Sequence, residues 1–349
     1  MATIYDIAKE AGVSAATVSK VLNGKTDVGA KTSERVKKIA SELNYHPNSI
    51  ARGLATKKSD TIGVFFQDHL NTGFRHPFLQ DVLASFKDTI GKNGYDLIFF
   101  ANDHPDNQME TFEARAKNRH VDGLFLLGVP RTDPNLFSLV QSGIPCMSVD
   151  LDLIGPNASY ITSDNVGGAQ KAVDYLVEMG HEDIAFISDV FATKPGQDRL
   201  MGFKTAMEKH RLPILTKWII ASDFSEKGGY LSTLKILESD HLPTAIFCAG
   251  DMMAIGAMEA ITEKGLKIGK DISIIGFDDI KLLNYVKPSL TTIRQKKDIM
   301  GEMAADELLK LMNDSNYFPS PLSIETELVI RSTVIRRGTT KSTDDSIEV

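Results

Sequence analysis

The sequence of 349 residues is poor in cysteine, tryptophan and long apolar runs. Its two cysteines, Cys146 and Cys248, lie inside short apolar segments, which favours buried free thiols in a reducing cytoplasm over a disulfide framework. No apolar run approaches the roughly 18–20 residues that span a membrane. No basic segment followed by an apolar core begins the chain. We therefore expect a cytoplasmic protein with no membrane segment.

Sequence motifs of catalysis are missing as well. The chain contains no Gly-x-Ser-x-Gly, no His-Glu-x-x-His, no Gly-x-x-x-x-Gly-Lys and no cysteine pair at metal-binding spacing. These patterns mark a serine nucleophile, a zinc centre, a phosphate-binding loop and a thiolate metal site. We therefore expect no enzyme activity, no cofactor and no metal site.

Charge is distributed unevenly along the chain. Residues 1–60 contain ten lysines and arginines against six acidic residues, a net charge of +4, while the whole chain carries −7 and the remainder therefore −11. A basic N-terminal segment attached to an acidic remainder concentrates the attraction for phosphate in the first 60 residues. We expect contacts with DNA to be confined to that segment.

The N-terminal stretch predicts two short helices joined by a tight turn. Apolar residues recur at the i, i+3, i+4 and i+7 spacing from Ile4 to Ala11, and Gly12 then interrupts the pattern. Ser14 is suited to cap a second helix with Val18 on its buried side. The outer side would carry small or hydroxylic side chains and one base: Ala15, Ala16, Thr17, Ser19 and Lys20. Such a helix-turn-helix can enter a DNA major groove.

A third helix and a short amphipathic segment follow. Apolar residues from Val36 to Leu43 repeat the helical spacing, which is enough to close a three-helix core. The segment from Pro47 to Thr56 is too short to form a stable helix by itself.

From Thr61 onward, short apolar runs alternate with helical patterns. The apolar runs are 62–66, 97–100, 123–127, 146–149, 184–188, 245–248 and 272–277. The helical patterns lie near 78–92, 106–119, 165–179, 197–210, 227–238 and 252–264. This alternation predicts an α/β fold of doubly wound parallel sheets with helices on both faces, and the length suffices for two such halves.

The order of these motifs resembles the lactose-repressor/galactose-repressor (LacI/GalR) family of bacterial transcription regulators. The resemblance rests on Ile-Tyr-Asp-Ile-Ala, Gly-Val-Ser, Thr-Val-Ser-Lys-Val-Leu-Asn and Asn-Tyr-His-Pro-Asn in that order, and continues to about residue 335. It implies a helix-turn-helix headpiece over 1–46 and a hinge helix with linker over 47–60. It further implies a body resembling type I periplasmic binding proteins, with an N-lobe (61–161 and 294–322), a C-lobe (162–290 and 323–334) and a polar tail (335–349).

The resemblance also implies roles in DNA binding. Ala15, Ala16 and Lys20 would face the bases, and Lys20 can donate to guanine. Side chains expected at the phosphates are Thr3, Ser14, Thr17, Ser19, Tyr45 and Asn48. The hinge would place Leu54 as a wedge in the minor groove, with Ile50 and Ala51 on the same apolar face. Asp27 lies in a loop where some members contact DNA, and the sequence leaves open whether it faces DNA.

The resemblance, together with a tail that lacks a leucine heptad, predicts a homodimer. The two-fold symmetry of a homodimer implies a pseudo-palindromic operator in double-stranded DNA.

Polar residues that directly follow apolar strands predict a ligand site, because open α/β sheets bind ligands beyond the carboxyl ends of their strands. Asp150 and Asp278 follow two such strands, and Arg199 opens a helix after another. Carboxylates accept hydrogen bonds and an arginine donates them, which suits the hydroxyls of a sugar. By the resemblance, Asp278 and Arg199 are the first effector contacts. Phe224 matches a position where family members stack an aromatic ring, and the remaining candidates are Gln295, His76 and Phe78.

Three functions remain open from the sequence. We expect a dimeric repressor of carbohydrate-utilisation genes that a sugar or sugar phosphate bound between the lobes releases from its operator. A regulator of purine or catabolite-control type, whose DNA binding is tightened by an effector or a phosphoprotein, could use the same side chains. A solute-binding protein of a transporter would share the body fold, but it would carry an export signal and lack the basic headpiece.

Overall fold

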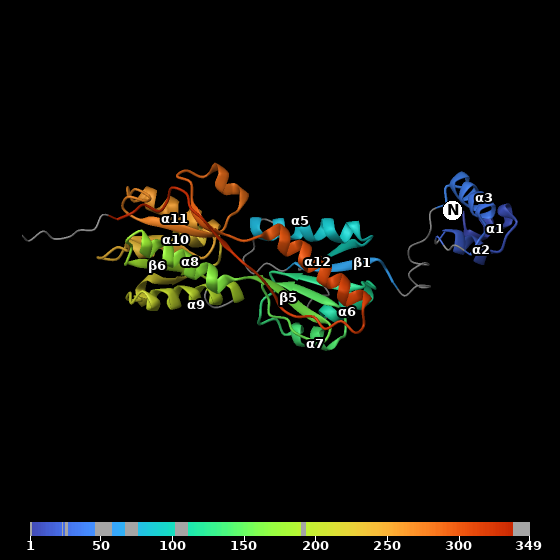
Figure 1. The fold of residues 1–349 in the computed structure, drawn as a ribbon, viewed down its shortest axis with the longest axis horizontal. Coiled ribbons are helices and arrows are strands. Elements are labelled where there is room, and N and C mark those ends of the chain that lie inside the picture. The colour runs from blue at the N-terminus through green and yellow to red at the C-terminus, as the bar shows by residue number, and fades with distance from the viewer. Residues whose placement is uncertain are drawn as a thin grey trace, which may run out of the picture. The chain divides into compact units, whose positions relative to one another are not determined.

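The computed structural model describes residues 2–22, 24, 27–45, 58–66, 76–101, 111–189 and 193–337 (Figure 1). The chain divides into two compact units, residues 1–59 and residues 60–349. The predicted hinge residues Asn48, Ile50, Ala51 and Leu54 lie outside the described residues.

The first unit is a three-helix headpiece. Helices α1 (Ile4–Ala11) and α2 (Ala15–Leu22) form the helix-turn-helix, and α3 (Ala30–Glu42) packs against both. Gly12 ends α1 in the left-handed conformation (φ 64°), a backbone shape that glycine adopts without a steric penalty. The apolar faces meet in one core, made of Ile7, Ala8, Ala11, Val18, Val21, Val36, Ile39 and Ala40. The three predicted helices are therefore confirmed.

The second unit is built on two six-stranded sheets, A and B. Sheet A has the order β11 (Leu322–Ile324), β5 (Ala158–Ser163), β4 (Cys146–Val149), β3 (Gly123–Leu127), β1 (Thr61–Phe66), β2 (Asp96–Phe100), with every pair parallel. Sheet B has the order β12 (Glu327–Val329), β10 (Thr291–Arg294), β9 (Ser273–Asp278), β8 (Ala245–Cys248), β6 (Ile184–Ser188), β7 (Ile219–Ala221). Only the pair of β10 and β12 is antiparallel among the described strands. We call the part built on sheet A the N-lobe and the part built on sheet B the C-lobe.

Helices cover both faces of sheet A. Phe125 and Leu127 of β3 point into a core beneath α5 (Pro77–Lys92) and α12 (Lys297–Asn313). Leu124 and Leu126 of the same strand point into a second core, and its covering helices are α6 (Phe112–Asn118) and α7 (Asn135–Gln141). The alternation of side chains along the strand therefore produces two cores in one lobe.

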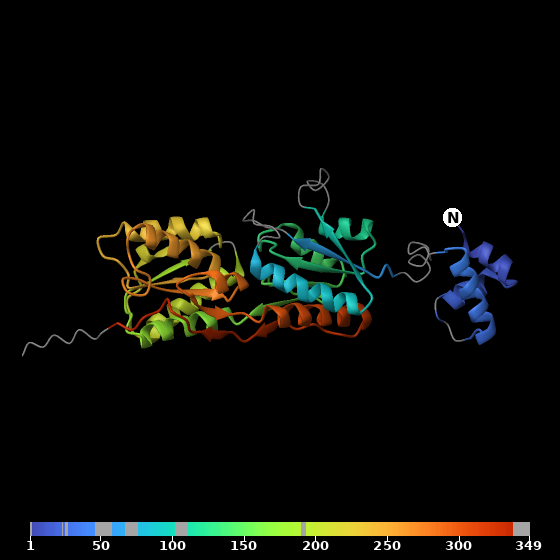
Figure 2. The ribbon, with the colours of Figure 1, turned by 90° about the horizontal axis from the view of Figure 1, so that it is seen from above.

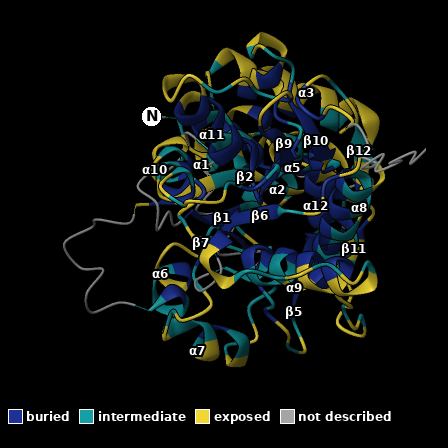
Figure 3. Ribbon diagram, turned by 90° about the vertical axis from the view of Figure 1, so that its left-hand side faces the viewer, coloured by how far each residue is buried: buried dark blue, intermediate teal, exposed yellow. Residues whose placement is uncertain are grey.

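The C-lobe repeats this three-layer arrangement (Figure 2). One helix pair is α8 (Asn165–Glu178) with α9 (Lys194–Lys209), and the other is α10 (Glu226–Leu237) with α11 (Asp251–Glu263). A Cβ at Gly276 of β9 would meet Ala254 of α11, whereas the next residue, Phe277, lies against Gly168 of α8. The two pairs therefore cover opposite faces of sheet B. Figure 3 shows buried strands, with exposed residues on the outer faces of helices and on loops.

Three segments connect the lobes, at positions that differ slightly from those expected. The chain passes between sheets after β5 at residue 163, after β10 at 294 and after β11 at 324, whereas the sequence placed these points at 161, 290–294 and 322. Strands β5, β10 and β11 are rich in hydroxyl side chains, so they lack the continuous apolar pattern of the other strands. The residues at which these three strands end depend on their hydrogen bonds to neighbouring strands in the same sheet.

The C-lobe also extends beyond the predicted boundary at 334. The carbonyl oxygen of Ile335 lies 3.2 Å from Nε2 of His181, and the N–H of Arg337 donates to the carbonyl of Met179 at 2.9 Å. Residues 335–337 therefore belong to the folded body, and the predicted tail begins too early. No helix in the described part of the chain is long and apolar enough to cross a membrane.

Candidate DNA-binding surface and effector cleft

The outer face of α2 presents few large side chains. Ser14, Ala16 and Lys20 are exposed, while Ala15 is half-buried and packs against the headpiece core. Oγ of Ser14 accepts the N–H of Thr17 at 3.1 Å, which confirms the predicted helix cap. Apart from Lys20, this face carries methyl and hydroxyl groups that fit close to base edges.

Lys20 does not extend freely from this face. Its Nζ lies 2.5 Å from Oδ2 of Asp27, and about half of each side chain is exposed. Asp27 therefore lies beside the candidate base-reading residue.

Two predicted phosphate contacts also stabilise the headpiece. Thr3 caps α1, because its hydroxyl oxygen accepts the N–H of Asp6 at 3.3 Å. In return, its backbone N–H and its hydroxyl donate to Oδ2 of Asp6, both at 2.8 Å. These hydrogen bonds lower the pKa of Asp6. Tyr45 packs partly against the headpiece core. Ser19 is half-buried on α2.

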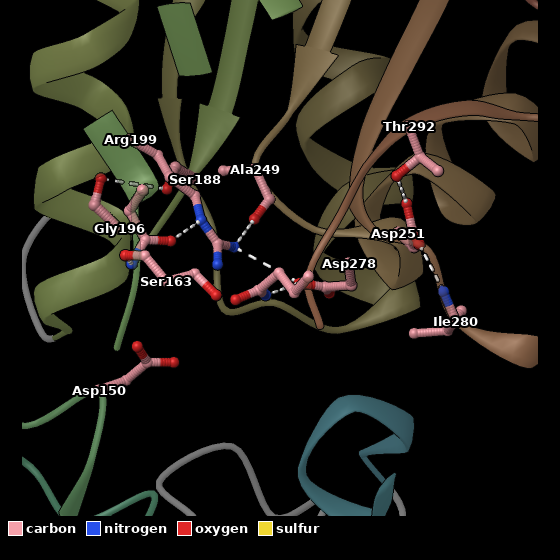
Figure 4. Close-up of polar contacts among 12 residues, drawn as sticks. Asp150, Ser163, Ser188, Gly196, Arg199, Ala249, Asp251, Asp278, Ile280 and Thr292 are labelled. Carbon is pink, nitrogen blue, oxygen red and sulfur yellow. Dashed lines mark hydrogen bonds and ion pairs between the residues drawn. The ribbon is translucent and has the colours of Figure 1, made fainter. Parts of the chain in front are cut away.

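In the C-lobe, Arg199 is the centre of a buried polar cluster (Figure 4). Its Nε donates to Oδ1 of Asn165 at 2.8 Å and its Nη1 donates to the carbonyl of Ala249 at 2.5 Å. Its Cζ lies 3.7 Å from the ring centroid of Phe277, so the guanidinium is stacked on an aromatic face. Burial lowers the pKa of Arg199, and nearby carboxylates, chiefly Asp278, oppose this effect. The cation is thus held rigidly, with only 3% of its surface exposed.

Asp278 lies at the end of β9, beside this cation. Its Oδ1 is 3.8 Å from Nη1 of Arg199 and accepts a hydrogen bond from Nε2 of Gln295 at 2.6 Å. Asp278 and Asp279 both have positive φ angles, 122° and 52°, a conformation that non-glycine residues rarely adopt. Nζ of Lys297 donates to the carbonyls of both residues, at 2.7 and 2.9 Å. This lysine therefore holds the backbone that presents the Asp278 carboxylate.

The N-lobe contributes Asp150, directly after β4. In Figure 4 Asp150 faces Arg199 from the opposite side of the cleft. Its backbone is left-handed (φ 56°) and its Oδ1 accepts the hydroxyl of Thr162 at 2.6 Å. Burial raises the pKa of Asp150, and the Thr162 hydrogen bond and Arg199 counteract the shift. Asn165 donates to Thr162 at 3.1 Å, so one hydrogen-bond chain links the Asp150 and Arg199 sides of the cleft.

The aromatic candidates occupy different places. Phe224 is 9% exposed, has a left-handed backbone (φ 57°) and lies with its ring centroid 5.8 Å from Cζ of Arg199. A Cβ at Gly250 would come within 3.0 Å of that ring, so the small residue leaves room for it. Phe78, in contrast, is packed in the N-lobe core. His76 precedes α5 at the N-cap position without a side-chain capping bond, and the centroid of its ring lies 6.4 Å from that of Phe78.

Asp251 is a fully buried carboxylate behind the cleft. It accepts the hydroxyl of Thr292 at 2.6 Å and the N–H of Ile280 at 3.0 Å. Burial raises its pKa well above the usual value, and the charge of Asp278 raises it further. These contacts position the strand ends of β9 and β10 that carry Asp278 and Gln295.

Two further features lie outside the Arg199 cluster. Arg131 of the N-lobe binds Asp152 through two hydrogen bonds, at 2.8 and 2.5 Å, and donates to Gln197 of the C-lobe at 2.7 Å, which bridges the lobes. A hollow of about 590 Å³ lies between α5, the start of α12 and the loop after β9, and its lining shares Gln295 and Lys297 with the surroundings of Asp278. Its lining includes the ion pair of Lys281 and Asp81, 2.8 Å apart. Among the described residues, no cluster of three or more His, Cys, Asp or Glu side chains could hold a metal ion.

Sequence reasoning missed several polar residues of this region. Thr162 and Ser163 belong to the hydroxyl-rich strand β5, which has no strong strand pattern, and Asn165 begins the helix after it. Asp251 opens α11 after Ala249 and Gly250, which follow the end of β8, so a rule that takes only the residue directly after a strand passes over it. Lys297 has no sequence signal, because a lysine at the start of a helix is usually exposed.

Comparison with known proteins identifies the family that has this architecture. Residues 3–48 match the bacterial regulatory proteins of the lacI family, and residues 173–334 match the periplasmic binding protein-like domain. The chain is 36% identical to the HTH-type transcriptional repressor PurR of Histophilus somni (strain 129Pt), over 96% of this chain and 99% of the relative.

Two solved structures are similar over almost the whole chain. A lac repressor dimer bound to operator and the anti-inducer ONPF is 30% identical, with a TM-score of 0.83 over 96% of this chain and 99% of that one. A complex of the transcriptional regulator CelR with cellobiose is 26% identical, with a TM-score of 0.73 over 95% of this chain and 100% of that one. The chain thus belongs to the LacI family and is a DNA-binding transcriptional repressor, not an enzyme.

Proposed function

We propose that the effector of this repressor is a carbohydrate bound between the lobes, and that it releases the protein from its operator. The observation that carries the proposal is the arrangement of Asp150 and Asp278 around the buried guanidinium of Arg199. Two carboxylates accept hydrogen bonds from neighbouring hydroxyls, and a guanidinium donates to the oxygens between them. A polyhydroxylated ligand matches this alternation of acceptors and donors.

Two polar atoms nearby add to this support. Oε1 of Gln295 and Oγ of Ser163 are buried, and neither has a hydrogen-bond partner among the described residues. Because a buried polar group without a partner costs free energy, both atoms gain from a hydroxyl that reaches them. In the relative with cellobiose, a sugar is the bound ligand.

A sugar suits this cleft better than a nucleobase. A base is commonly held by stacking on aromatic side chains, and of the two candidate phenylalanines only Phe224 lies near Arg199. Phe78 is only 5% exposed and packed in the N-lobe core, so it offers no ring face to a ligand. Among the described candidates, the ring of Phe224 is the one placed to lie against an apolar face of a sugar ring.

The same geometry supports a switch. Asp150 comes from the N-lobe and Arg199 from the C-lobe, so a ligand that contacts both binds most tightly at one lobe arrangement. The ligand then has different binding free energies for the two lobe arrangements. This difference is the free energy available to weaken operator binding. We propose that the headpiece, the hinge and the two lobes act in this way in a homodimer on a pseudo-palindromic operator. The similar lac repressor structure, a dimer bound to operator, supports the dimeric part of this proposal.

The test is operator affinity of the full chain, measured with and without a panel of mono- and oligosaccharides. We expect one sugar to weaken binding at least tenfold in the wild type. Asp278→Asn should lose this response and keep its affinity for DNA without sugar. The matched control Asp240→Asn, at an exposed C-lobe position, should respond as wild type does.

Tighter operator binding in the presence of a nucleobase or a phosphorylated carrier protein would contradict the proposal and favour corepression. A wild-type protein that no sugar affects would contradict it as well.

A further inference from the structure

The ion pair between Lys20 and Asp27 lies beside the face of α2 that carries the predicted base-reading residues. Lys20 occupies the last turn of α2, and Asp27 lies in the segment between α2 and α3. Their charged atoms are 2.5 Å apart, although both side chains remain about half exposed. A carboxylate beside a surface that meets phosphates is electrostatically unfavourable for DNA affinity in general. The position of Asp27 therefore needs an explanation other than affinity.

The hydrogen-bonding capacity of Lys20 provides an explanation for the position of Asp27. An ammonium group has three donors, so Lys20 can keep one on Asp27 and still offer two to guanine O6 and N7. A free lysine, in contrast, is a flexible cation that any nearby phosphate attracts. The other predicted base-facing residues, Ala15 and Ala16, contribute no hydrogen bonds, so among these three residues discrimination by hydrogen bonding depends on Lys20.

We propose that Asp27 is a specificity-determining residue that acts through Lys20. Its carboxylate fixes the ammonium where it can donate to a base and keeps it away from phosphates. The pair then costs little operator affinity, because the guanine contact is retained. It lowers the affinity for other sequences, because one positive charge is neutralised on a headpiece whose first 60 residues have a net charge of only +4.

The substitution Asp27→Asn tests this proposal in the full chain. The probes are a duplex selected from a randomised pseudo-palindromic library and a scrambled duplex of the same length. We expect affinity for the scrambled duplex to rise roughly three- to tenfold, with a salt dependence steeper by about 0.9 in log K against log[salt]. Affinity for the selected duplex should change less than twofold. The specificity ratio, which is the affinity for the selected duplex divided by the affinity for the scrambled duplex, therefore falls.

Two controls separate this role from a general effect of charge or of folding. Glu10→Gln makes the same charge change at an exposed position of α1 and should leave the specificity ratio unchanged. In the Lys20→Ala background, Asp27→Asn should no longer alter the ratio, because the side chain on which it acts is absent. Thermal melting of each variant reports whether the headpiece still folds.

Four outcomes would overturn the proposal. The first is an Asp27→Asn variant with an unchanged ratio and salt slope. The second is the same loss of ratio in the Lys20→Ala background, which would show that Asp27 acts by another route. The third is a large loss of affinity for the selected duplex without a gain in affinity for the scrambled duplex, which would make Asp27 a direct base contact. If Lys20→Ala alone leaves specificity intact, the premise that Lys20 reads a base fails, while repression by the headpiece stands.

Discussion

Replacing Lys297 with methionine should destabilise the body far more than the same change at the neighbouring Lys296. Lys297 begins α12, which packs on α5 in the N-lobe, yet its ammonium donates to the carbonyls of Asp278 and Asp279 in the C-lobe. Only 9% of the residue is exposed. Methionine keeps most of the side-chain volume and removes the charge and the donors.

The expected magnitude follows from the contacts. A hydrogen bond to a charged group contributes about 1.5–3 kcal/mol net, and two such bonds are lost at Lys297. Methionine recovers part of this through apolar packing, so we expect a loss of about 3 kcal/mol in the free energy of unfolding. For a domain of this size that corresponds to a fall of about 5–10 °C in Tm. Lys296 instead forms a partly exposed ion pair with Glu327 at 2.9 Å, which contributes little to stability because water screens the two charges.

The assay is scanning calorimetry of the full chain, with urea unfolding of both variants as a second measure. If the two variants unfold within about 0.5 kcal/mol of each other, the reasoning about the buried ammonium is wrong. The backbone at Asp278 and Asp279 should also relax when the ammonium is removed. On the proposed function, Lys297→Met should therefore require more sugar than Lys296→Met to release DNA.

Three further changes test other parts of the structure. Burial lowers the pKa of His181 to about 4 from 6.5, so the free energy of unfolding should fall by about 3 kcal/mol as the pH drops through that window, and His181→Asn should flatten the dependence of this free energy on pH. Burial raises the pKa of Asp150, so the charged carboxylate lowers the stability of the folded protein at a pH above the pKa that Asp150 has in the unfolded chain. Urea titrations should therefore show Asp150→Asn more stable than wild type at pH 7, with no gain below about pH 4. Thr3→Ala removes the capping box of α1 and should lower headpiece stability by about 1 kcal/mol, which unchanged amide exchange protection of residues 4–11 would disprove.

The sequence by itself determined the elements whose causes are local. The headpiece helices depend on apolar spacings of three and four residues and on caps such as Ser14, all within one or two turns. Most strands of the body are buried on both faces, so they appear as continuous apolar runs between helical patterns. Asp150 and Asp278 could be placed at the ends of strands for the same reason. Their identification as effector contacts depended on the family resemblance, not on spacing.

The tertiary structure alone decided which distant residues meet. Arg199 donates a hydrogen bond to the carbonyl of Ala249, 50 positions away in the sequence. Lys297 donates to the carbonyls of Asp278 and Asp279, which precede it by 18–19 positions. Phe78 lies in the first turn of an amphipathic helix, and the packing of α5 against sheet A buries its ring in the N-lobe core. A local pattern fixes which side of an element is apolar. Which element that side meets depends on the summed packing of the whole lobe, and so does the environment of a polar group buried between elements.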